Sequence, residues 1–158
     1  MPFVLCRIDD RLIHGQVVVG WGQPLRVQRI VLVDEQVAAS PWEQELYRMA
    51  VPDDMEVVVA SPAEAAAQLA AWHADPAPAI LLTGDIEVMA RLREAAPGVV
   101  TRINLGAVHQ REGRTRYLPY LFLAEAEVAR LRGLRDGGCV VTAQDVPSAA
   151  PVDVLHLG

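Results

Sequence analysis

The greatest concentration of reactive side chains in the sequence lies near its start, where carboxylates, a guanidinium and an imidazole follow a short apolar run. Asp9, Asp10 and Arg11 are consecutive, and His14 directly precedes Gly15 and a second apolar run. These side-chain types are the parts of a phosphohistidine site, because a neutral imidazole can attack phosphorus while guanidinium and amide groups stabilise the transferred charge. His14 is therefore a candidate nucleophile and Arg11 a candidate phosphate clamp.

The two aspartates have alternative roles. Either Asp9 or Asp10 could accept a hydrogen bond from the His14 ring, which would fix its tautomer and make the other nitrogen the better nucleophile. The sequence favours Asp9 slightly and leaves the choice open. A paired general acid and base is a weaker alternative, since adjacent side chains on an extended chain point in opposite directions. A histidine among acids in a loop can also be a solvated surface residue.

The elements that must position these side chains alternate between two kinds. Short, nearly continuous apolar runs are typical of parallel strands covered on both faces, and helical stretches separate them. This alternation predicts the α/β class, with one domain over residues 1–158 that forms an open, mainly parallel sheet with helices on both faces. The predicted strands are 3–8, 29–33, 55–60, 79–83, 99–104 and 139–142, and the predicted helices are 15–22, 41–50, 62–72, 86–95 and 124–135.

In such sheets, ligands bind beyond the carboxyl ends of the strands, and the His14 stretch follows the first predicted strand. The backbone amides of Gly15 and Gln16, at the start of the next helix, are expected to contact phosphate. Gly84 follows the fourth strand and is also predicted near the phosphate, although the neighbouring Asp85 could simply cap a helix. His109 lies in a polar segment, 106–121, which is either a binding loop or a hairpin, and we predict a contact with the site or with a partner.

Composition excludes several classes of function. The net charge of −6 argues against a general nucleic-acid or anionic-membrane binder. All 14 cationic side chains are arginine, which excludes chemistry that requires lysine, such as Schiff-base formation. Four scattered histidines do not suggest a metal site, and Gly20 and Gly22 form an incomplete dinucleotide fingerprint, so we expect neither a metal nor a cofactor.

The redox and targeting signals point to the cytoplasm. Cys6 and Cys139 each lie in an apolar run, which favours buried free thiols over a disulfide. The start of the chain lacks the basic residues of a signal peptide, and no apolar run approaches the ~20 residues that a membrane span needs. We therefore expect a cytoplasmic protein.

The stretch "RIDDRLIHGQV", from Arg7 to Val17 and followed by Trp21, resembles the active-site signature of a known family. This family comprises the mannose/sorbose-class enzyme IIB components of the bacterial phosphoenolpyruvate-dependent sugar phosphotransferase system. The similarity continues through "IVLVDEQVAASPWEQELYRMAVP", "INLGAV" and "GGCVVTAQDVP", so it covers nearly the whole chain.

The resemblance implies that His14 accepts phosphate from the histidine of a phosphorylated IIA protein and passes it to a sugar at the membrane components IIC and IID. It also implies that Arg11 and Asp9 belong to the same active-site loop. Two other functions stay open: a regulatory module that is phosphorylated without serving a transporter, and a small-molecule binding domain without phosphotransfer. The sugar, the phosphorylated ring nitrogen and the oligomeric state, including a homo-oligomer, also stay open.

Overall fold

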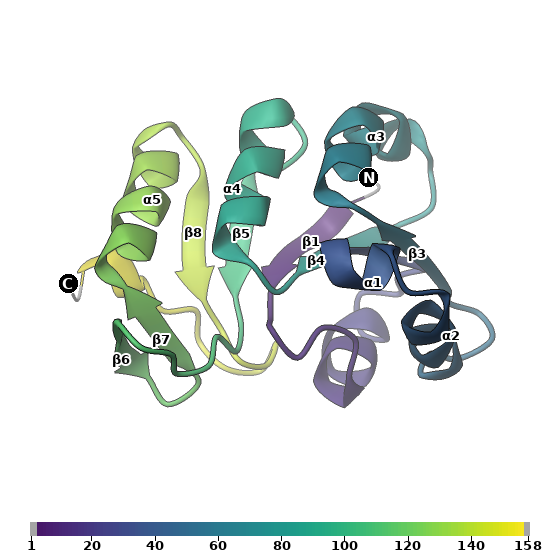
Figure 1. Ribbon diagram of the computed structural model, residues 1–158, viewed down its shortest axis with the longest axis horizontal. Helices are drawn as coiled ribbons and strands as arrows, with labels where there is room; N and C mark the ends of the chain where they lie inside the picture. Colours follow the sequence, from purple (N-terminus) through teal and green to yellow (C-terminus); the bar gives the residue numbers. More distant parts are fainter. Residues whose placement is uncertain (1–2, 157–158) are drawn as a thin grey trace.

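A six-stranded parallel sheet forms the centre of the molecule, seen in a computed structural model that describes residues 3–156 (Figure 1). Its strands are β1 (Phe3–Ile8), β2 (Arg29–Val33), β3 (Glu56–Ala60), β4 (Ala79–Thr83), β5 (Arg102–Leu105) and β8 (Val140–Ala143). Their order across the sheet is β3-β2-β4-β1-β5-β8. The strand that precedes His14 therefore lies in the interior of the sheet, between β4 and β5.

The helices follow the strands in the predicted alternation. Two of them begin where a serine hydroxyl accepts a backbone hydrogen bond: Ser40 from Glu43 at 3.3 Å and Ser61 from Glu64 at 3.2 Å. The helices are the π-helix η1 (Gln16–Gly22), α1 (Glu35–Ala38), α2 (Pro41–Met49), α3 (Pro62–Ala74), α4 (Ile86–Ala95), α5 (Glu125–Asp136) and the 3-10 helix η2 (Val154–His156).

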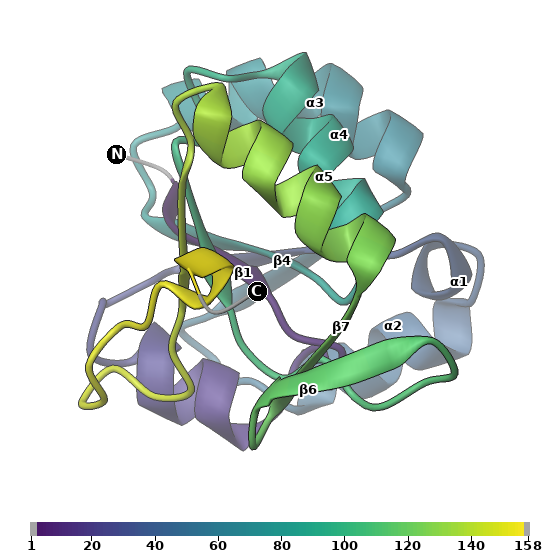
Figure 2. The same cartoon turned by 90° about the vertical axis from the view of Figure 1, so that its left-hand side faces the viewer.

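Helices cover both faces of the sheet, which confirms the predicted architecture (Figure 2). Helices α3, α4 and α5 lie on one face, where Leu69, Met89 and Leu131 pack with the sheet in one apolar cluster. The second cluster, on the other face, includes Val17 of η1 and Val37 of α1. Because both faces are buried, the central strands consist of nearly unbroken apolar residues.

The segment 106–121 consists of a loop over residues 106–113, followed by the first strand and the turn of a hairpin. Strand β6 (Arg114–Leu118) pairs antiparallel with β7 (Leu121–Ala124), which leads directly into α5. The sequence left a hairpin as one of two alternatives for this segment, because most side chains over residues 114–118 are polar.

Helix α1 was not predicted. Asp34 Oδ1 caps it by accepting a hydrogen bond from Val37 N–H at 2.9 Å, so Asp34 serves as a helix cap after β2. The helix is a single turn, and only Val37 of it is buried. Such a short element leaves too little hydrophobic periodicity to be recognised in the sequence.

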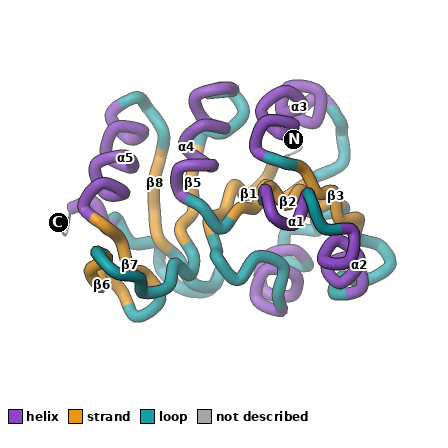
Figure 3. The backbone as a smooth tube through the Cα atoms, in the orientation of Figure 1, coloured by secondary structure: helices purple, strands orange, loops and turns teal. Residues whose placement is uncertain are grey.

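The carboxyl ends of β1 and β5 lie at the edge where such sheets bind ligands. The helix after β1, η1, lies on one face, while the hairpin and α5 after β5 lead to the other face. The loops that follow β1, β5 and β8 meet along this edge of the sheet (Figure 3). In parallel sheets, neighbouring strands whose helices leave to opposite faces create a binding site between them.

The two cysteines are free and buried, as the sequence predicted. Burial raises the pKa of the Cys6 thiol to about 12, so it is not a nucleophile near neutral pH. Across residues 3–156, no helix has both the length and the hydrophobicity needed to cross a membrane.

Candidate functional site

Arg7, the residue before the last in β1, forms the floor of the site. Its neighbours Cys6 and Ile8 point into the cluster under α3 to α5, so the alternation of the strand turns Arg7 towards η1. The side chain is fully buried, and its guanidinium lies 4.9 Å from the centre of the Trp21 ring. A buried guanidinium requires several acceptors and a counter-charge.

These acceptors come from the neighbouring strand and from the segment after β8. Arg7 Nη1 donates to Asn104 Oδ1 and, at 2.7 Å, to the Gln144 carbonyl oxygen. Arg7 Nη2 donates to the Asp145 carbonyl oxygen at 3.0 Å and to Asp9 Oδ2 at 3.3 Å. Arg7 thus joins the ends of β1, β5 and β8.

Asp9 is the central carboxylate of the site, and its side chain is fully buried. In addition to Arg7, it accepts two parallel hydrogen bonds from Arg11, one from Nε to Oδ1 and one from Nη2 to Oδ2, both at 3.1 Å. Burial acts to raise the pKa of Asp9, but the Arg11 hydrogen bonds and the charges of Arg7 and Arg11 outweigh it, so the pKa lies below its ordinary value. Asp9 is therefore ionised near neutral pH.

The His14 ring lies between this carboxylate and the start of η1, with its side chain 20% exposed. Its Nε2 lies 3.3 Å from Asp9 Oδ2, at ion-pair distance but without the alignment of a hydrogen bond. Its Nδ1 accepts a hydrogen bond from Gln16 N–H at 3.3 Å. This acceptor role assigns the ring proton to Nε2 and the lone pair to Nδ1.

The surroundings of His14 keep it neutral. Burial lowers the pKa of the imidazole below its ordinary value, and the positive charges of Arg11 and Arg7 act in the same direction, while Asp9 opposes them. A neutral ring near pH 7 has the lone pair that a nucleophile needs.

Arg11 lies at the solvent side of the same group. Its Nη2 donates to Gln16 Oε1 at 2.8 Å, and its side chain is 34% exposed. The guanidinium is thus held by Asp9 and Gln16 but stays accessible to an anion that arrives at His14. A partly exposed, doubly held guanidinium is suited to binding phosphate oxygens.

Gly106, directly after β5, is required for this packing. A Cβ at this position would overlap the Arg7 guanidinium and would lie 2.7 Å from Asp9 Oδ2. We therefore expect Gly106→Ala to lower the free energy of unfolding by about 1–3 kcal/mol, as overpacked sites do. Gly133→Ala is the control, because nothing lies within 4 Å of its added Cβ. Urea unfolding measures both, and an unchanged stability of Gly106→Ala would mean that the guanidinium can move aside.

The family of the chain follows from a comparison with known proteins. The model of the family "PTS system sorbose subfamily IIB component" matches residues 3–157. The chain belongs to this family. The sorbose-subfamily IIB chains are components of the phosphotransferase system, so the resemblance of the stretch from Arg7 to Val17 is confirmed.

Individual relatives agree with this assignment. The sorbose-specific EIIB component of Klebsiella pneumoniae is 29% identical over 159 residues, which covers 98% of this chain and 94% of that protein. The N-acetylgalactosamine-specific enzyme IIB component 2 of Escherichia coli is 28% identical over 165 residues, with 99% of each chain covered. The crystal structure of the IIBSor domain of the Klebsiella pneumoniae sorbose permease has a TM-score of 0.88 at 27% identity and covers 99% of this chain and 95% of that one.

The structure brings some of the residues predicted from the IIB signature together around His14 and places others beside them. Asp9 and Gln16 each contact the His14 ring, and Arg11 links them by contacting both, whereas Gly15 is exposed at the start of η1. These contacts favour Asp9 as the acid that orients the ring, and that role stays a proposal.

Gly84 and His109 both lie against Asp10, the residue that follows Asp9. Both carboxylate oxygens of Asp10 accept hydrogen bonds from His109. A Cβ at Gly84 would lie 3.1 Å from Asp10 Cα, so Gly84 packs behind the loop. Asp85 Oδ1 caps α4 by accepting from Val88 N–H at 3.0 Å. A direct phosphate contact of Gly84 stays a prediction.

Sequence reasoning missed Arg7 and the groups that hold it. Arg7 is part of the signature, but its role depends on Asn104 and on carbonyl oxygens of residues 144 and 145, which are distant in the sequence. The signal that could have identified it is a lone charge inside an otherwise apolar strand, since a buried arginine needs a carboxylate partner. Trp21, which follows the signature, is buried and donates to the Asp145 carbonyl oxygen at 3.3 Å.

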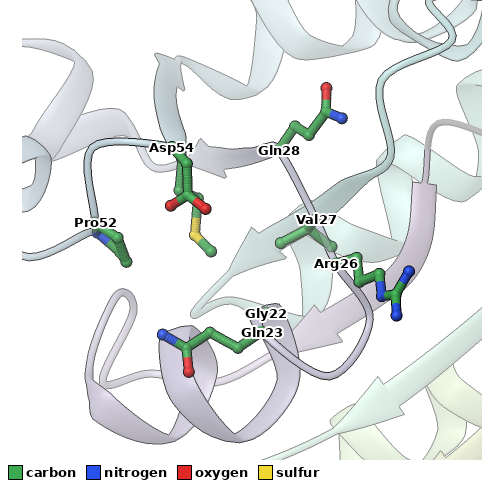
Figure 4. A pocket seen from close by; sticks show the side chains of 8 residues that line it. Gly22, Gln23, Arg26, Val27, Gln28, Pro52 and Asp54 are labelled. Atoms are coloured by element: carbon green, nitrogen blue, oxygen red, sulfur yellow. The ribbon is translucent and has the colours of Figure 1, made fainter.

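A separate cavity of about 580 Å³ lies at the opposite edge of the sheet, at the amino ends of β2 and β3. Figure 4 shows Arg26 and Gln28 on one side of it and Pro52 and Asp54 on the other. Because His14 follows the carboxyl end of β1, this cavity is not part of the IIB site.

Proposed function

We propose that residues 1–158 act as one cytoplasmic phosphocarrier domain, in which His14 accepts phosphate from a phosphorylated IIA protein and passes it to a sugar at a membrane IIC/IID permease. The orientation of the His14 ring is the observation that carries the proposal. Its Nε2 faces the buried Asp9 carboxylate, and its Nδ1 carries the lone pair at the start of η1. The protein is thus a protein-phosphohistidine:sugar phosphotransferase, and the relatives, which are phosphotransferase IIB components, support it.

The first step transfers the phosphoryl group between two histidines. The Nδ1 lone pair of His14 attacks the phosphorus, the new Nδ1–P bond forms, and the N–P bond of the donor breaks with its electron pair left on the donor nitrogen. The positive charge that develops on the His14 ring is stabilised by Asp9, 3.3 Å from Nε2. The amide of Gln16, which donates to Nδ1 in the free protein, then becomes available to a phosphoryl oxygen.

The second step transfers the group to a sugar hydroxyl. The oxygen attacks the phosphorus, the Nδ1–P bond breaks, and its electron pair returns to Nδ1, while the hydroxyl proton leaves to a base or to water. The names of the relatives include sorbose and N-acetylgalactosamine systems, so the family relationship does not by itself define the sugar.

The decisive experiment incubates the purified protein with a phosphorylated mannose/sorbose-class IIA protein. We expect one phosphate per chain that is acid-labile and base-stable, with mass spectrometry mapping it to His14 and nitrogen NMR placing it on Nδ1. A chain that stays unlabelled, or a phosphate on another residue, would disprove the carrier role. Adding membranes that contain IIC and IID then tests the second step, because a purely regulatory module would keep its phosphate in the presence of sugar.

Arg11 provides a test of the phosphate clamp. We expect Arg11→Ala to slow phosphate acceptance by about 10²-fold, the usual cost of removing one donor that stabilises transferring charge. The side chain lies on a loop outside the apolar core and Arg7 still neutralises Asp9, so cooperative unfolding should persist. Reactions with the phosphorylated IIA protein, quenched at set times, measure the rate of phosphate acceptance. The control is Arg102→Ala, at the amino end of β5. Loss of cooperative melting in Arg11→Ala would instead identify a structural arginine.

A further inference from the structure

His109 and Asp10 form a contact that the transfer chemistry does not use. Asp10 Oδ2 accepts from His109 N–H at 2.7 Å, and Asp10 Oδ1 lies 2.5 Å from His109 Nδ1. The Asp10 side chain is only 14% exposed, while that of His109 is 66% exposed. Both the backbone and the ring of His109 thus hold one carboxylate, although the ring lies mostly in solvent.

The His109 end of this contact is anchored in the fold. The preceding residue, Val108, forms a bridge with Leu121 of the hairpin, and Arg114 Nη1 donates to the His109 carbonyl oxygen at 2.8 Å. Arg114 also makes two parallel hydrogen bonds, both at 2.9 Å, to Glu127 of α5. Because α5 packs into the core through Val128 and Leu131, His109 is tied to a rigid element.

The Asp10 end belongs to a loop with little regular structure of its own. Leu12 adopts a φ of 61°, in the left-handed region that is unfavourable for a residue with a side chain. The loop is held by Asp10 N–H, which donates to the Ala107 carbonyl oxygen at 2.9 Å, and by Leu12 N–H, which donates to the Asp9 carbonyl oxygen at 2.9 Å. An irregular loop of this kind keeps its shape only when contacts outside it hold it there.

Asp9 and Asp10 divide their contacts between two sides of this loop. Asp9 contacts the His14 ring, and Asp10 contacts His109. Because Asp10 is the residue next to Asp9 in the same loop, a shift of Asp10 reaches Asp9, whose carboxylate lies 3.3 Å from His14 Nε2.

We propose that His109 is a positioning residue for phosphoryl transfer, acting through Asp10 to hold the loop in the geometry that orients His14. This inference rests on the proposed carrier function. His109 does not touch the phosphorus; its effect reaches His14 through Asp10 and Asp9. Displacing a reacting group by a fraction of an ångström to about 1 Å slows transfer on the order of ten- to hundredfold.

The rate of single-turnover phosphoryl transfer from a phosphorylated IIA protein tests this proposal. It is measured over donor concentrations from limiting to saturating. We expect His109→Ala to lower the saturated rate about tenfold while leaving the donor concentration for half-maximal rate within about twofold. His109→Asn should restore most of the rate, because its amide nitrogen can donate to Asp10 from nearly the same position as Nδ1. The control is Gln110→Ala, the exposed neighbour of His109, which should behave like the parent.

Two further measurements separate positioning from other roles. The double variant His109→Ala with Asp10→Ala should be no slower than Asp10→Ala alone, since both changes remove the contact between the His109 ring and the Asp10 carboxylate. In the protein without phosphate, the ring nitrogen signals of His14 should differ strongly from each other in the parent and in His109→Asn, and should move closer together in His109→Ala as the two tautomers mix.

An unchanged saturated rate and unchanged His14 signals in His109→Ala would overturn the proposal, as would additive effects in the double variant. A rise in the half-maximal donor concentration alone would also overturn it, because it would make His109 a docking residue. The nitrogen signals need no phosphate, so they decide the positioning role even if the parent protein is never labelled by a IIA donor, which would be a failure of the carrier function.

Discussion

Replacing His14 with alanine should abolish phosphate acceptance from a phosphorylated IIA protein, with a fall in the labelling rate of at least about 10³-fold. The reason is that alanine has no lone pair to attack phosphorus, whereas His14 Nδ1 has one and accepts a hydrogen bond from the Gln16 amide. The fold should persist, because the His14 side chain lies on a loop and is 20% exposed. Labelling with radioactive phosphate measures the rate, and urea unfolding checks the fold.

The matched control for this prediction is His73→Ala. His73 is near the end of α3, which leads to the amino end of β4 and thus to the edge of the sheet opposite His14. Its loss should leave the labelling rate unchanged. Should His14→Ala be labelled as fast as the parent, His14 is not the carrier and the proposed function is wrong.

The fold could be predicted because its central strands lie between two layers of helices. Val31, Leu32, Leu81 and Leu82 are all completely buried, so each strand appears in the sequence as a continuous apolar run. The hairpin could not be predicted in the same way. Strand β6 carries exposed residues such as Arg116, and its pairing with β7 depends on the turn between them and on α5.

The candidate site could be predicted only where its residues are contiguous. The order Asp9, Arg11, His14 predicts that a carboxylate, a guanidinium and an imidazole lie on one loop. The choice between Asp9 and Asp10 depends on which of them faces Arg7 and which faces His109, and this follows from the position of β5 beside β1. Contacts between segments that are distant in the sequence cannot be inferred from the local sequence.

Asp9→Ala should be the most destabilising substitution at the site, with a loss of about 3–5 kcal/mol in the free energy of unfolding. Asp9 is fully buried and compensates two guanidinium groups, so its removal leaves Arg7 buried without a carboxylate. The pKa of Asp9 is lower in the folded protein than its ordinary value, so its contribution is complete at neutral pH. It disappears as the pH falls below that ordinary value towards the folded pKa. Urea unfolding at neutral and acidic pH measures the difference from the parent, which should shrink in acid.

Variants of Asp10 and Arg7 test whether the stability cost of Asp9→Ala comes from the buried Arg7–Asp9 pair. Asp10→Ala removes a contact with the His109 ring, which is 66% exposed, and one hydrogen bond from the His109 N–H, and should cost about 1–2 kcal/mol, less than Asp9→Ala. Arg7→Met combined with Asp9→Ala should be less destabilised than the sum of the two single changes by about 1–3 kcal/mol, because the double variant has no uncompensated charge at the centre of the site. If the two costs instead add, Asp9 does not stabilise the fold by neutralising Arg7. The stability cost of Asp9→Ala would then come from its other contacts, such as the two hydrogen bonds from the Arg11 side chain.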